Sequence, residues 1–383
     1  MEQQKKILYV HHSRAVGGAQ RSLSFLLDQM DSSKYSISVL CIFKGKVLEL
    51  FEAKPIDLIV NDSIFPFHGS TVTGMSFKIF LSNILRLPSS LIAAYRQIIR
   101  EKPDILHLNS TSLFVVALAA KIYSKKIKVV CHVREPLLKN SFSAFVIKHM
   151  NHLLVDHFIA IDHFTGASMK VKGNMTVIYN SVDFREYHPL VKSSILSNEL
   201  SLHSESVIFL YLARIVKGNG ALELIEAASK LKEEFPQFKF VLAGLPENTS
   251  DTYANRVKLA AKSNNNVYLM PYRNDITNLI ASSHVLIVPF TEPHFARSIV
   301  EAAAMSKPTI GANVGGVNEL IVHGKTGYLY ETLGELVQYC VLLGTSEELR
   351  REMGERSVKL AKEIFDSSAA TTQVMEVYEQ LLS

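Results

Sequence analysis

The residues with the clearest chemical potential lie in the second half of the chain, where cations and glycines alternate over a short distance. An apolar run ends at Leu212 and is followed by Arg214 and by the segment IVKGNG, which contains Lys217 and Gly220. Arginine presents a planar fork that matches a diphosphate, lysine adds a point charge, and glycine lets backbone N–H groups approach an anion. Such fixed positive charge would stabilise a leaving diphosphate. An exposed basic loop without a ligand is the alternative.

Two carboxylates flank a predicted helix further along the chain. The segment VLIVPFTEPHFARSIVEAAAMSKPTIG indicates a strand, a polar loop, a helix that begins near Arg297 and another strand. Glu301 falls one turn inside that helix, where an ionised side chain is costly unless it meets a ligand or hydrogen-bond donors. A ribose diol would be such a partner, and a buried salt bridge is the alternative. Glu292 in the loop could bind sugar hydroxyls, with His294 as a rival for that role.

Two further candidate positions lie in the first half. Gly17 and Gly18 follow the first apolar run and open a segment of helical period, so a phosphate could bind at the start of that helix. A tight turn is the alternative, and the lack of a G-x-G-x-x-G pattern disfavours a dinucleotide dehydrogenase. His132 ends the run VVCHV. It could bind a sugar hydroxyl or position the reacting centre, or simply bond to local backbone groups.

The elements that must position these residues follow the pattern of parallel sheets, in which short β-branched runs alternate with segments of helical period. The first series of runs comprises Ile7–Val10, Ile37–Phe43, Ile105–Leu108, Val129–Val133, Phe158–Ile161 and Val177–Tyr179. The second series comprises Val207–Leu212, Phe238–Ala243, Val267–Met270, Val285–Pro289 and Pro308–Ala312. Open α/β sheets bind ligands outside the carboxyl ends of their strands, which is where all the candidate residues fall.

The length of the chain permits two such sheets. It has 383 residues, 48% of them apolar, which is more than one ordinary core requires. A polar, Ser-rich interval over residues 192–206 resembles a linker. We predict an α/β fold with two doubly wound, Rossmann-like domains facing across a cleft. The first covers residues 1–185, and the second covers residues 186–365.

Composition indicates the cellular setting. The start of the chain, MEQQKK, lacks the apolar core of a signal peptide, and the three cysteines, Cys41, Cys131 and Cys340, form no metal-binding cluster. We therefore expect a cytoplasmic protein with reduced thiols. Residues 1–185 hold 23 Lys and Arg against 13 Asp and Glu, whereas residues 186–383 hold 18 against 23. The basic half is expected to face an anionic membrane surface or an acidic acceptor, or only solvent.

One long segment of the first half combines basic and aliphatic residues. It reads SFKIFLSNILRLPSSLIAAYRQIIREK. Such a segment either lies on a membrane surface, which would make the protein peripheral on the inner face of the plasma membrane, or forms an ordinary amphipathic domain helix broken at Pro88.

In their order along the chain, the motifs resemble those of glycosyltransferase family 4, the retaining group 1 enzymes of the GT-B fold. GGAQRS resembles the family's first Gly-rich loop, and KPDILHLNS and VVCHVRE resemble the phrases that follow it. VIYNSVDFREYHP resembles the interdomain phrase, and AxR…KGxG resembles the diphosphate loop. EPHFARSIVEAAAMSKPTIG and GGVNELIVHGKTGYLY resemble the nucleotide-sugar signature. The resemblance covers essentially the whole chain.

This resemblance implies a transferase that moves a hexose-type sugar, with retention, from a UDP-, GDP- or ADP-linked donor to a saccharide or lipid-linked saccharide. It implies no metal, no other cofactor and no nucleic-acid partner, and a role in building a surface polymer or glycolipid. It implies that the first domain lies on the acceptor side, that the second domain binds the nucleotide-sugar donor, and that residues 366–383 cross back onto the first domain. The implied catalytic residues are His132, Arg214, Lys217 and Glu292. The implied donor-binding residues are Gly17, Gly18, Arg214, Lys217, His294, Phe295, Ala296, Arg297 and Glu301.

Three positions depart from the family pattern. Asn219 stands where a lysine is usual, which leaves the second phosphate cation open. Pro293 stands in the slot of the first glutamate, with Glu292 one residue earlier, and His284 replaces an acidic residue before the preceding strand. The departures at Asn219 and Pro293 keep open a catalytically silent sugar-binding or scaffolding subunit, and the shared GT-B architecture keeps open a nucleotide-sugar epimerase.

Overall fold

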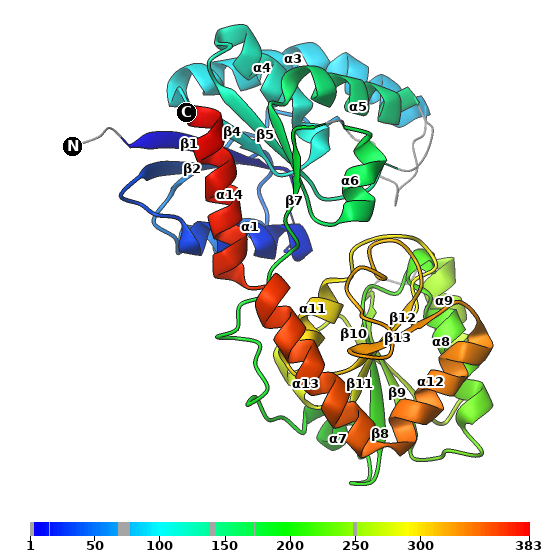
Figure 1. Ribbon diagram of the computed structural model, residues 1–383. Coiled ribbons are helices and arrows are strands. Elements are labelled where there is room, and N and C mark those ends of the chain that lie inside the picture. The colour runs from blue at the N-terminus through cyan, green and yellow to red at the C-terminus, as the bar shows by residue number, and fades with distance from the viewer. Residues whose placement is uncertain (1–3, 15, 68–76, 138–141, 172, 248–250) are drawn as a thin grey trace. The chain divides into compact units, whose positions relative to one another are not determined.

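The protein, represented by a computed structural model, forms two compact units (Figure 1). The structure describes residues 4–14, 16–67, 77–137, 142–171, 173–247 and 251–383. Unit 1 comprises Met1–Ser181 and Ser367–Ser383, and unit 2 comprises Val182–Asp366. Each unit is built around one parallel sheet.

The sheet of unit 1 has seven strands in the order β3-β2-β1-β4-β5-β6-β7, and its hydrogen-bonded neighbours run parallel. The strands are β1 (Lys5–His11), β2 (Tyr35–Cys41), β3 (Asp57–Val60), β4 (Ile105–Leu108), β5 (Lys128–Val133), β6 (His157–Ala160) and β7 (Met175–Val177). The central strands are buried on both faces and are therefore rich in Val, Ile and Leu.

Two groups of helices bury the faces of this sheet in separate apolar clusters. One face packs against α1 (Gly18–Gln29), α2 (Val47–Glu52) and α14 (Ser367–Leu382). The other packs against α3 (Phe77–Glu101), α4 (Phe114–Tyr123), α5 (Phe142–Leu154) and α6 (His163–Met169). The C-terminal helix α14 thus completes the core of the unit that begins the chain.

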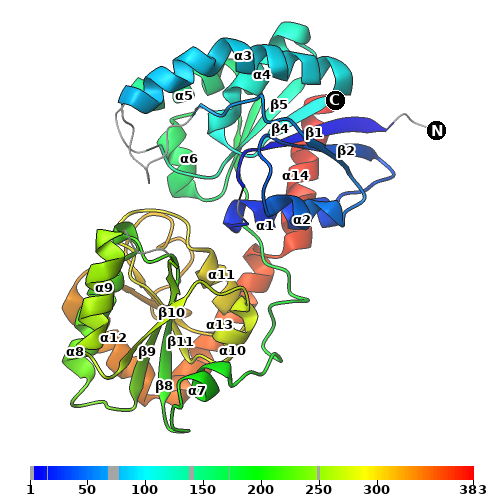
Figure 2. The same cartoon turned by 180° about the vertical axis from the view of Figure 1, so that it is seen from behind.

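The sheet of unit 2 has six strands in the order β10-β9-β8-β11-β12-β13, again parallel. The strands are β8 (Val207–Leu212), β9 (Phe238–Leu245), β10 (Val267–Pro271), β11 (Val285–Val288), β12 (Thr309–Ala312) and β13 (Gly327–Tyr330). Figure 2 shows α8 (Ala221–Leu231), α9 (Thr252–Lys262) and α12 (Leu333–Thr345) on one face of the sheet. The other face carries α10 (Ile276–Ala281), α11 (Arg297–Ala304) and α13 (Glu347–Ile364), and α7 (Ile195–Glu199) packs against α10.

Both sheets have the Rossmann strand order, so the prediction of two doubly wound α/β domains is confirmed. In each sheet the order reverses beside the first strand, between β1 and β4 in unit 1 and between β8 and β11 in unit 2. Such reversal points are where open α/β sheets bind ligands, at the carboxyl ends of the strands.

The structure corrects two details of the sequence analysis. The interval 192–206 lies within unit 2 and contains α7, whose Leu196 is fully buried, so it is not a free linker. The helix around Pro88 is not broken either, because α3 runs without interruption through it. Proline at position 88 has no N–H to donate to the carbonyl oxygen of Ile84. Because Pro88 and Ile84 are both exposed, that oxygen can accept a hydrogen bond from water instead.

Candidate active site

In unit 2, the loops that follow β8 and β11 are joined at the reversal point of the sheet. The carbonyl oxygen of Gly218 accepts hydrogen bonds from the backbone N–H groups of Thr291, at 3.0 Å, and Glu292, at 3.1 Å. The Thr291 hydroxyl donates to the carbonyl oxygen of Lys217 at 3.2 Å. These bonds bring together the two loops in which most of the candidate residues were predicted.

Glycine makes this close approach possible. Gly220 has a φ of +68°, and a Cβ at this position would lie 1.6 Å from the carbonyl oxygen of Pro289. A Cβ on Gly218 would lie 2.8 Å from a carboxylate oxygen of Glu292. Gly220 therefore needs glycine for both its backbone conformation and its space, whereas at Gly218 the exposed side chain of Glu292 could move aside.

Asn219, the departure from the family pattern, fastens the loop from within. Its buried side-chain amide donates to the carbonyl oxygen of Arg214 at 2.9 Å, and the hydroxyl of Tyr211 donates to the same oxygen at 2.9 Å. The side chains of Arg214 and Lys217 are exposed on this loop. The cations therefore face solvent at the carboxyl edge of the sheet, while the asparagine holds the backbone that carries them.

His294 is held by its own loop. Its Nδ1 lies 2.9 Å from the carbonyl oxygen of Glu292, and its ring stacks on Phe290 with the centroids 4.1 Å apart. Burial lowers the pKa of His294 below its usual value, so the neutral ring donates through Nδ1 and leaves Nε2 as an acceptor. Gly316, at a φ of +84°, packs so closely that a Cβ there would lie 2.6 Å from the carbonyl carbon of His294.

Glu301 and Arg297 form an ion pair at the start of α11. The Nε of Arg297 donates to Oε1 of Glu301 at 2.9 Å, one helical turn apart, and both side chains are largely buried. This is the salt bridge that the sequence analysis held as the alternative to a ribose contact. Because the pair offsets the cost of burying the carboxylate, burial alone does not indicate a ligand for Glu301.

Phe295 and Ala296 complete the predicted donor loop. Ala296 is buried and forms the N-cap of α11, which has no side-chain hydrogen bond at its cap. Phe295 is half-buried, and its backbone N–H lies beside Gly316. Arg214, Lys217, Glu292, His294, Phe295, Ala296, Arg297 and Glu301 thus all belong to the loops and helix start at one edge of unit 2.

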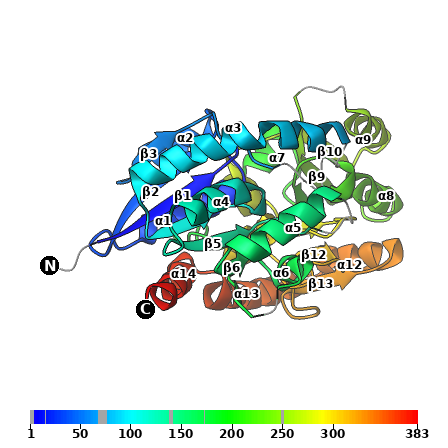
Figure 3. The ribbon, with the colours of Figure 1, turned by 90° about the horizontal axis from the view of Figure 1, so that it is seen from above.

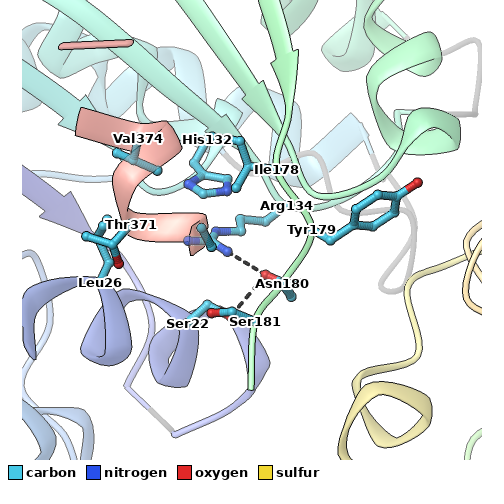
Figure 4. Close-up of a pocket in the computed structure, with 11 residues that line it drawn as sticks. Ser22, Leu26, His132, Arg134, Ile178, Tyr179, Asn180, Ser181, Thr371 and Val374 are labelled. Carbon is cyan, nitrogen blue, oxygen red and sulfur yellow. Dashed lines mark hydrogen bonds between the residues drawn. The ribbon is translucent and has the colours of Figure 1, made fainter. Parts of the chain in front are cut away.

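The remaining predicted residues belong to unit 1. Gly17 is the N-cap of α1, again without a side-chain hydrogen bond, and Gly18 is the first residue of that helix. His132, near the end of β5, lines a small pocket with residues of α1, α14 and the segment after β7 (Figure 4). The ring of His132 is only 5% exposed, and neither of its nitrogens has a hydrogen-bond partner among the described residues. Burial first, and then Arg134 and His107, lower its pKa well below the usual value.

Arg134 organises this pocket and was not among the predicted site residues. Its Nε donates to Asn109 at 3.0 Å and its Nη1 to Asn180 at 2.7 Å, as Figure 4 shows for the latter. Ser22 of α1 also donates to Oδ1 of Asn180, at 3.0 Å. Asn109, Arg134 and Asn180 all follow strands of one sheet, which is the signal that could have placed them together.

Two more histidines lie beside this network. Asn109 contacts Nδ1 of His11 at 3.2 Å, and Nδ1 of His107 lies 2.6 Å from the hydroxyl of Tyr378 in α14. Burial lowers the pKa of His11 and that of His107 to about 3 each. His11, His107 and His132 are therefore neutral at pH 7, and the guanidinium of Arg134 accounts for part of each shift.

Two Rossmann-ordered sheets, each with polar loops gathered at its reversal point, define a two-domain α/β enzyme of the GT-B architecture. Residues 16–186 match the family described as Glycosyltransferase Family 4, and residues 194–360 match Glycosyl transferases group 1. The chain therefore belongs to the family 4, group 1 glycosyltransferases. It is an enzyme that transfers a sugar from a nucleotide sugar.

The chain is similar to several curated proteins and solved structures. It is 25% identical over 337 residues to the N-acetyl-alpha-D-glucosaminyl L-malate synthase of Bacillus anthracis, covering 82% of this chain and 84% of that protein. It is 24% identical over 349 residues to the UDP-Gal:alpha-D-GlcNAc-diphosphoundecaprenol alpha-1,3-galactosyltransferase of Escherichia coli, covering 85% and 84%. Anabaena HepE, solved with UDP and glucose, shares the fold with a TM-score of 0.79 at 21% identity, over 98% of this chain and 100% of that one.

Proposed function

We propose that this enzyme is a retaining, metal-independent glycosyltransferase that moves a hexose-type sugar from a nucleoside diphosphate to a saccharide or lipid-linked saccharide. The observation that carries the proposal is the joining of the β8 and β11 loops through Gly218. It gathers exposed cations, a neutral imidazole and a helix start at one edge of unit 2.

Stabilisation of the leaving diphosphate is assigned to residues of the protein. Arg214 and Lys217 supply fixed positive charge, and the N-terminus of α8 follows directly at Gly220, where no side chain caps the helix. Unsatisfied N–H groups and the helix dipole favour negative charge at such a position. As the bond from the sugar to the diphosphate breaks, charge grows on the phosphate oxygens, and these groups stabilise it without a metal ion.

The sugar and ribose are assigned to the β11 loop and α11. His294 offers Nε2 as an acceptor and Glu292 offers a carboxylate, so either can bind sugar hydroxyls. Glu301 would bind the ribose diol through its carboxylate, which the hydrogen bond from Arg297 orients. In unit 1, His132 is assigned to the acceptor side as a neutral hydrogen-bonding group, because its lowered pKa removes the imidazolium at neutral pH.

The similar proteins support the substrate classes. The Escherichia coli protein is named for a UDP-galactose donor and a diphosphoundecaprenol-linked acceptor, and the Anabaena protein was solved with UDP-glucose. We therefore assign this enzyme to the assembly of a cell-envelope polysaccharide or glycolipid, on the cytoplasmic side of the membrane. UDP-sugars are the first donors to test.

The decisive experiment measures nucleoside diphosphate release from a panel of UDP-, GDP- and ADP-sugars, with and without a chelator. We expect slow release from one donor without acceptor, unchanged by the chelator, and retention of the anomeric configuration in the transferred product by NMR. Loss of activity with the chelator would contradict the metal-free mechanism. Interconversion of the sugar without release would favour an epimerase, and neither turnover nor donor binding would favour a silent subunit.

Variants locate the site within unit 2. Arg214→Ala should lower turnover by about 100-fold, because one preorganised charge is worth roughly 3 kcal/mol to a transition state. Glu301→Gln should weaken donor binding more than turnover. The control is Arg356→Ala in α13, an exposed arginine paired with Glu352, which should leave kinetics unchanged. Equal kinetics for all three variants would show that the donor binds elsewhere.

A further inference from the structure

Helix α3 of unit 1 exposes an apolar stripe on the side away from the core. Its inward face contributes Ala94 and Ile98 to the apolar cluster of unit 1. Five of the exposed apolar side chains of the helix recur at intervals of four and seven residues, which places them in one stripe, whereas Ile79 and Ile84 lie outside that series. They are Phe77, Leu81, Leu85, Ile92 and Ile99. Leu85 is 73% exposed and Phe77 77% exposed, values that a core helix does not normally leave to water.

Helix α5 extends this stripe with aromatic rings. Phe142 and Phe145, at its start, are 66% and 63% exposed. A chain of rings joins the two helices, with centroids 6.4 Å apart between Phe77 and Phe80, 5.0 Å between Phe80 and Phe142, and 6.4 Å between Phe142 and Phe145. Figure 3 looks onto the helices that carry these residues.

Basic side chains border the stripe. Lys78, Arg96 and Arg100 are exposed. Lys78 and Arg96 align along the helix because they are about five turns of 3.6 residues apart. Glu101, the last residue, is the only acidic one in α3, and α5 has none. Arg86 is not part of this border, because its guanidinium lies 4.9 Å over the ring of Phe65.

We call these ten residues the α3–α5 face: Phe77, Lys78, Leu81, Leu85, Ile92, Arg96, Ile99, Arg100, Phe142 and Phe145. Among the described residues, α3 is the one helix long and apolar enough to cross a membrane, by length and composition only. Its inward side chains, however, complete the core of unit 1, which a spanning helix could not do. An apolar stripe bordered by cations, on a helix packed along one side, is suited to lying in the plane of a bilayer surface.

We propose that the α3–α5 face binds an anionic lipid bilayer in-plane, beyond the sugar-transfer function of the enzyme. Leucine and phenylalanine side chains enter the interface between headgroups and acyl chains, and the three cations meet anionic headgroups. The excess of positive charge in the first half of the sequence acts in the same direction. A lipid surface fits better than a protein partner because the apolar stripe has cations at both of its ends, Lys78 at one and Arg96 and Arg100 at the other.

The test is co-sedimentation of the full-length enzyme with vesicles of phosphatidylcholine alone or mixed with phosphatidylglycerol. Wild type should bind the mixed vesicles, more weakly at high salt, and should bind vesicles of phosphatidylcholine alone at least about tenfold more weakly.

Leu85→Glu should weaken binding to the mixed vesicles by at least about tenfold, the effect of losing one buried leucine. The matched control is Leu259→Glu, because Leu259 is a leucine of unit 2 that is 66% exposed on α9, and it should bind like wild type. The triple variant Lys78→Ala, Arg96→Ala and Arg100→Ala should lose about fivefold per charge and the preference for phosphatidylglycerol.

A second variant and two other measurements keep the outcome decisive. Phe142→Ser probes the face from α5 if Leu85→Glu fails to fold, and donor affinity by calorimetry should be unchanged in every variant. Measuring donor affinity and vesicle binding separately distinguishes the two proposals, since donor binding can fail while lipid binding persists. Absence of wild-type binding, or equal binding by Leu85→Glu and Leu259→Glu, would overturn the proposal. So would a dimer in light scattering that Leu85→Glu dissociates, because the face would then bind a second copy of the chain.

Discussion

His11, His107 and His132 share the polar interior of unit 1 with the guanidinium of Arg134. Burial is the largest cause of all three lowered pKa values, and Arg134 adds to each. The consequence is a neutral set of imidazoles that can accept or donate hydrogen bonds at pH 7 without repelling Arg134. His132, with no hydrogen-bond partner among the described residues, is the member of this set that lines the pocket.

These shifts predict acid sensitivity. In the folded protein His11 and His107 stay neutral down to about pH 3, whereas the unfolded chain takes up protons below its ordinary value of 6.5. Stability is therefore complete above about pH 6.5 and falls as the pH falls toward 3, by roughly 2 kcal/mol for each group at pH 5. Scanning calorimetry at pH 7.5 and pH 5 measures the loss, and His107→Gln should reduce it. Identical unfolding at both pH values would contradict the neutral assignment.

Arg134→Met removes the side chain that joins Asn109 to Asn180. Two hydrogen bonds to a charged group are lost in a partly buried site, so we expect a destabilisation of about 2–4 kcal/mol at pH 7.5. The pH dependence should also become shallower, since the nearby positive charge is gone. Arg185→Met is the control, because Arg185 forms an exposed pair with Asp183 and should cost less than about 1 kcal/mol. Chemical denaturation of both variants measures the free energy of unfolding. An equal loss of stability in the two variants would show that the Arg134 network contributes no more than a surface ion pair.

At the scale of elements, the close contact of the β8 and β11 loops depends on Gly220. Gly220→Ala would place a methyl group against the carbonyl of Pro289 and keep a left-handed backbone. Gly324→Ala has a similar φ, +73°, but meets nothing within 4 Å. We expect about 1–2 kcal/mol of destabilisation at Gly324 from the backbone alone, and at least about 2 kcal/mol more at Gly220.

Denaturation and donor calorimetry together check this comparison. Gly220→Ala should also weaken donor binding, since the loop that carries Arg214 must shift, whereas Gly324→Ala should leave donor affinity unchanged. If the two alanine variants were equally stable and bound donor equally, the loop contact would be dispensable for the site.

The sequence was most informative where local pattern alone decides structure. The long buried strands and the β8 loop with Arg214 and Lys217 were predicted because their signals are contiguous. β3 and β13 were missed because both are four-residue edge strands, only partly buried, with weak alternation. The contact of Arg134 with Asn180 was not predicted, because the two residues are 46 positions apart and only their shared place at the carboxyl edge of one sheet, not a local spacing, indicates it. A salt bridge of Glu301 was held as an alternative, and the spacing of four residues on one helix could have identified Arg297 as its partner.

At the scale of the whole molecule, one fold is used twice for different purposes. Both units repeat the same strand order, and each gathers polar residues at its reversal point. Unit 2 gathers exposed cations and carboxylates, which suit a nucleotide sugar, whereas unit 1 gathers neutral imidazoles and carries the α3–α5 face. The C-terminal helix α14 returns to unit 1, so the chain termini stabilise the same core.

A crystal structure of the enzyme with the nucleotide sugar that binds most tightly in calorimetry tests the proposed donor site. We expect the diphosphate at the start of α8, within hydrogen-bond distance of Arg214, and the ribose hydroxyls on the carboxylate of Glu301. A nucleotide bound at the β1–α1 turn instead, with the β8 and β11 loops empty, would contradict it.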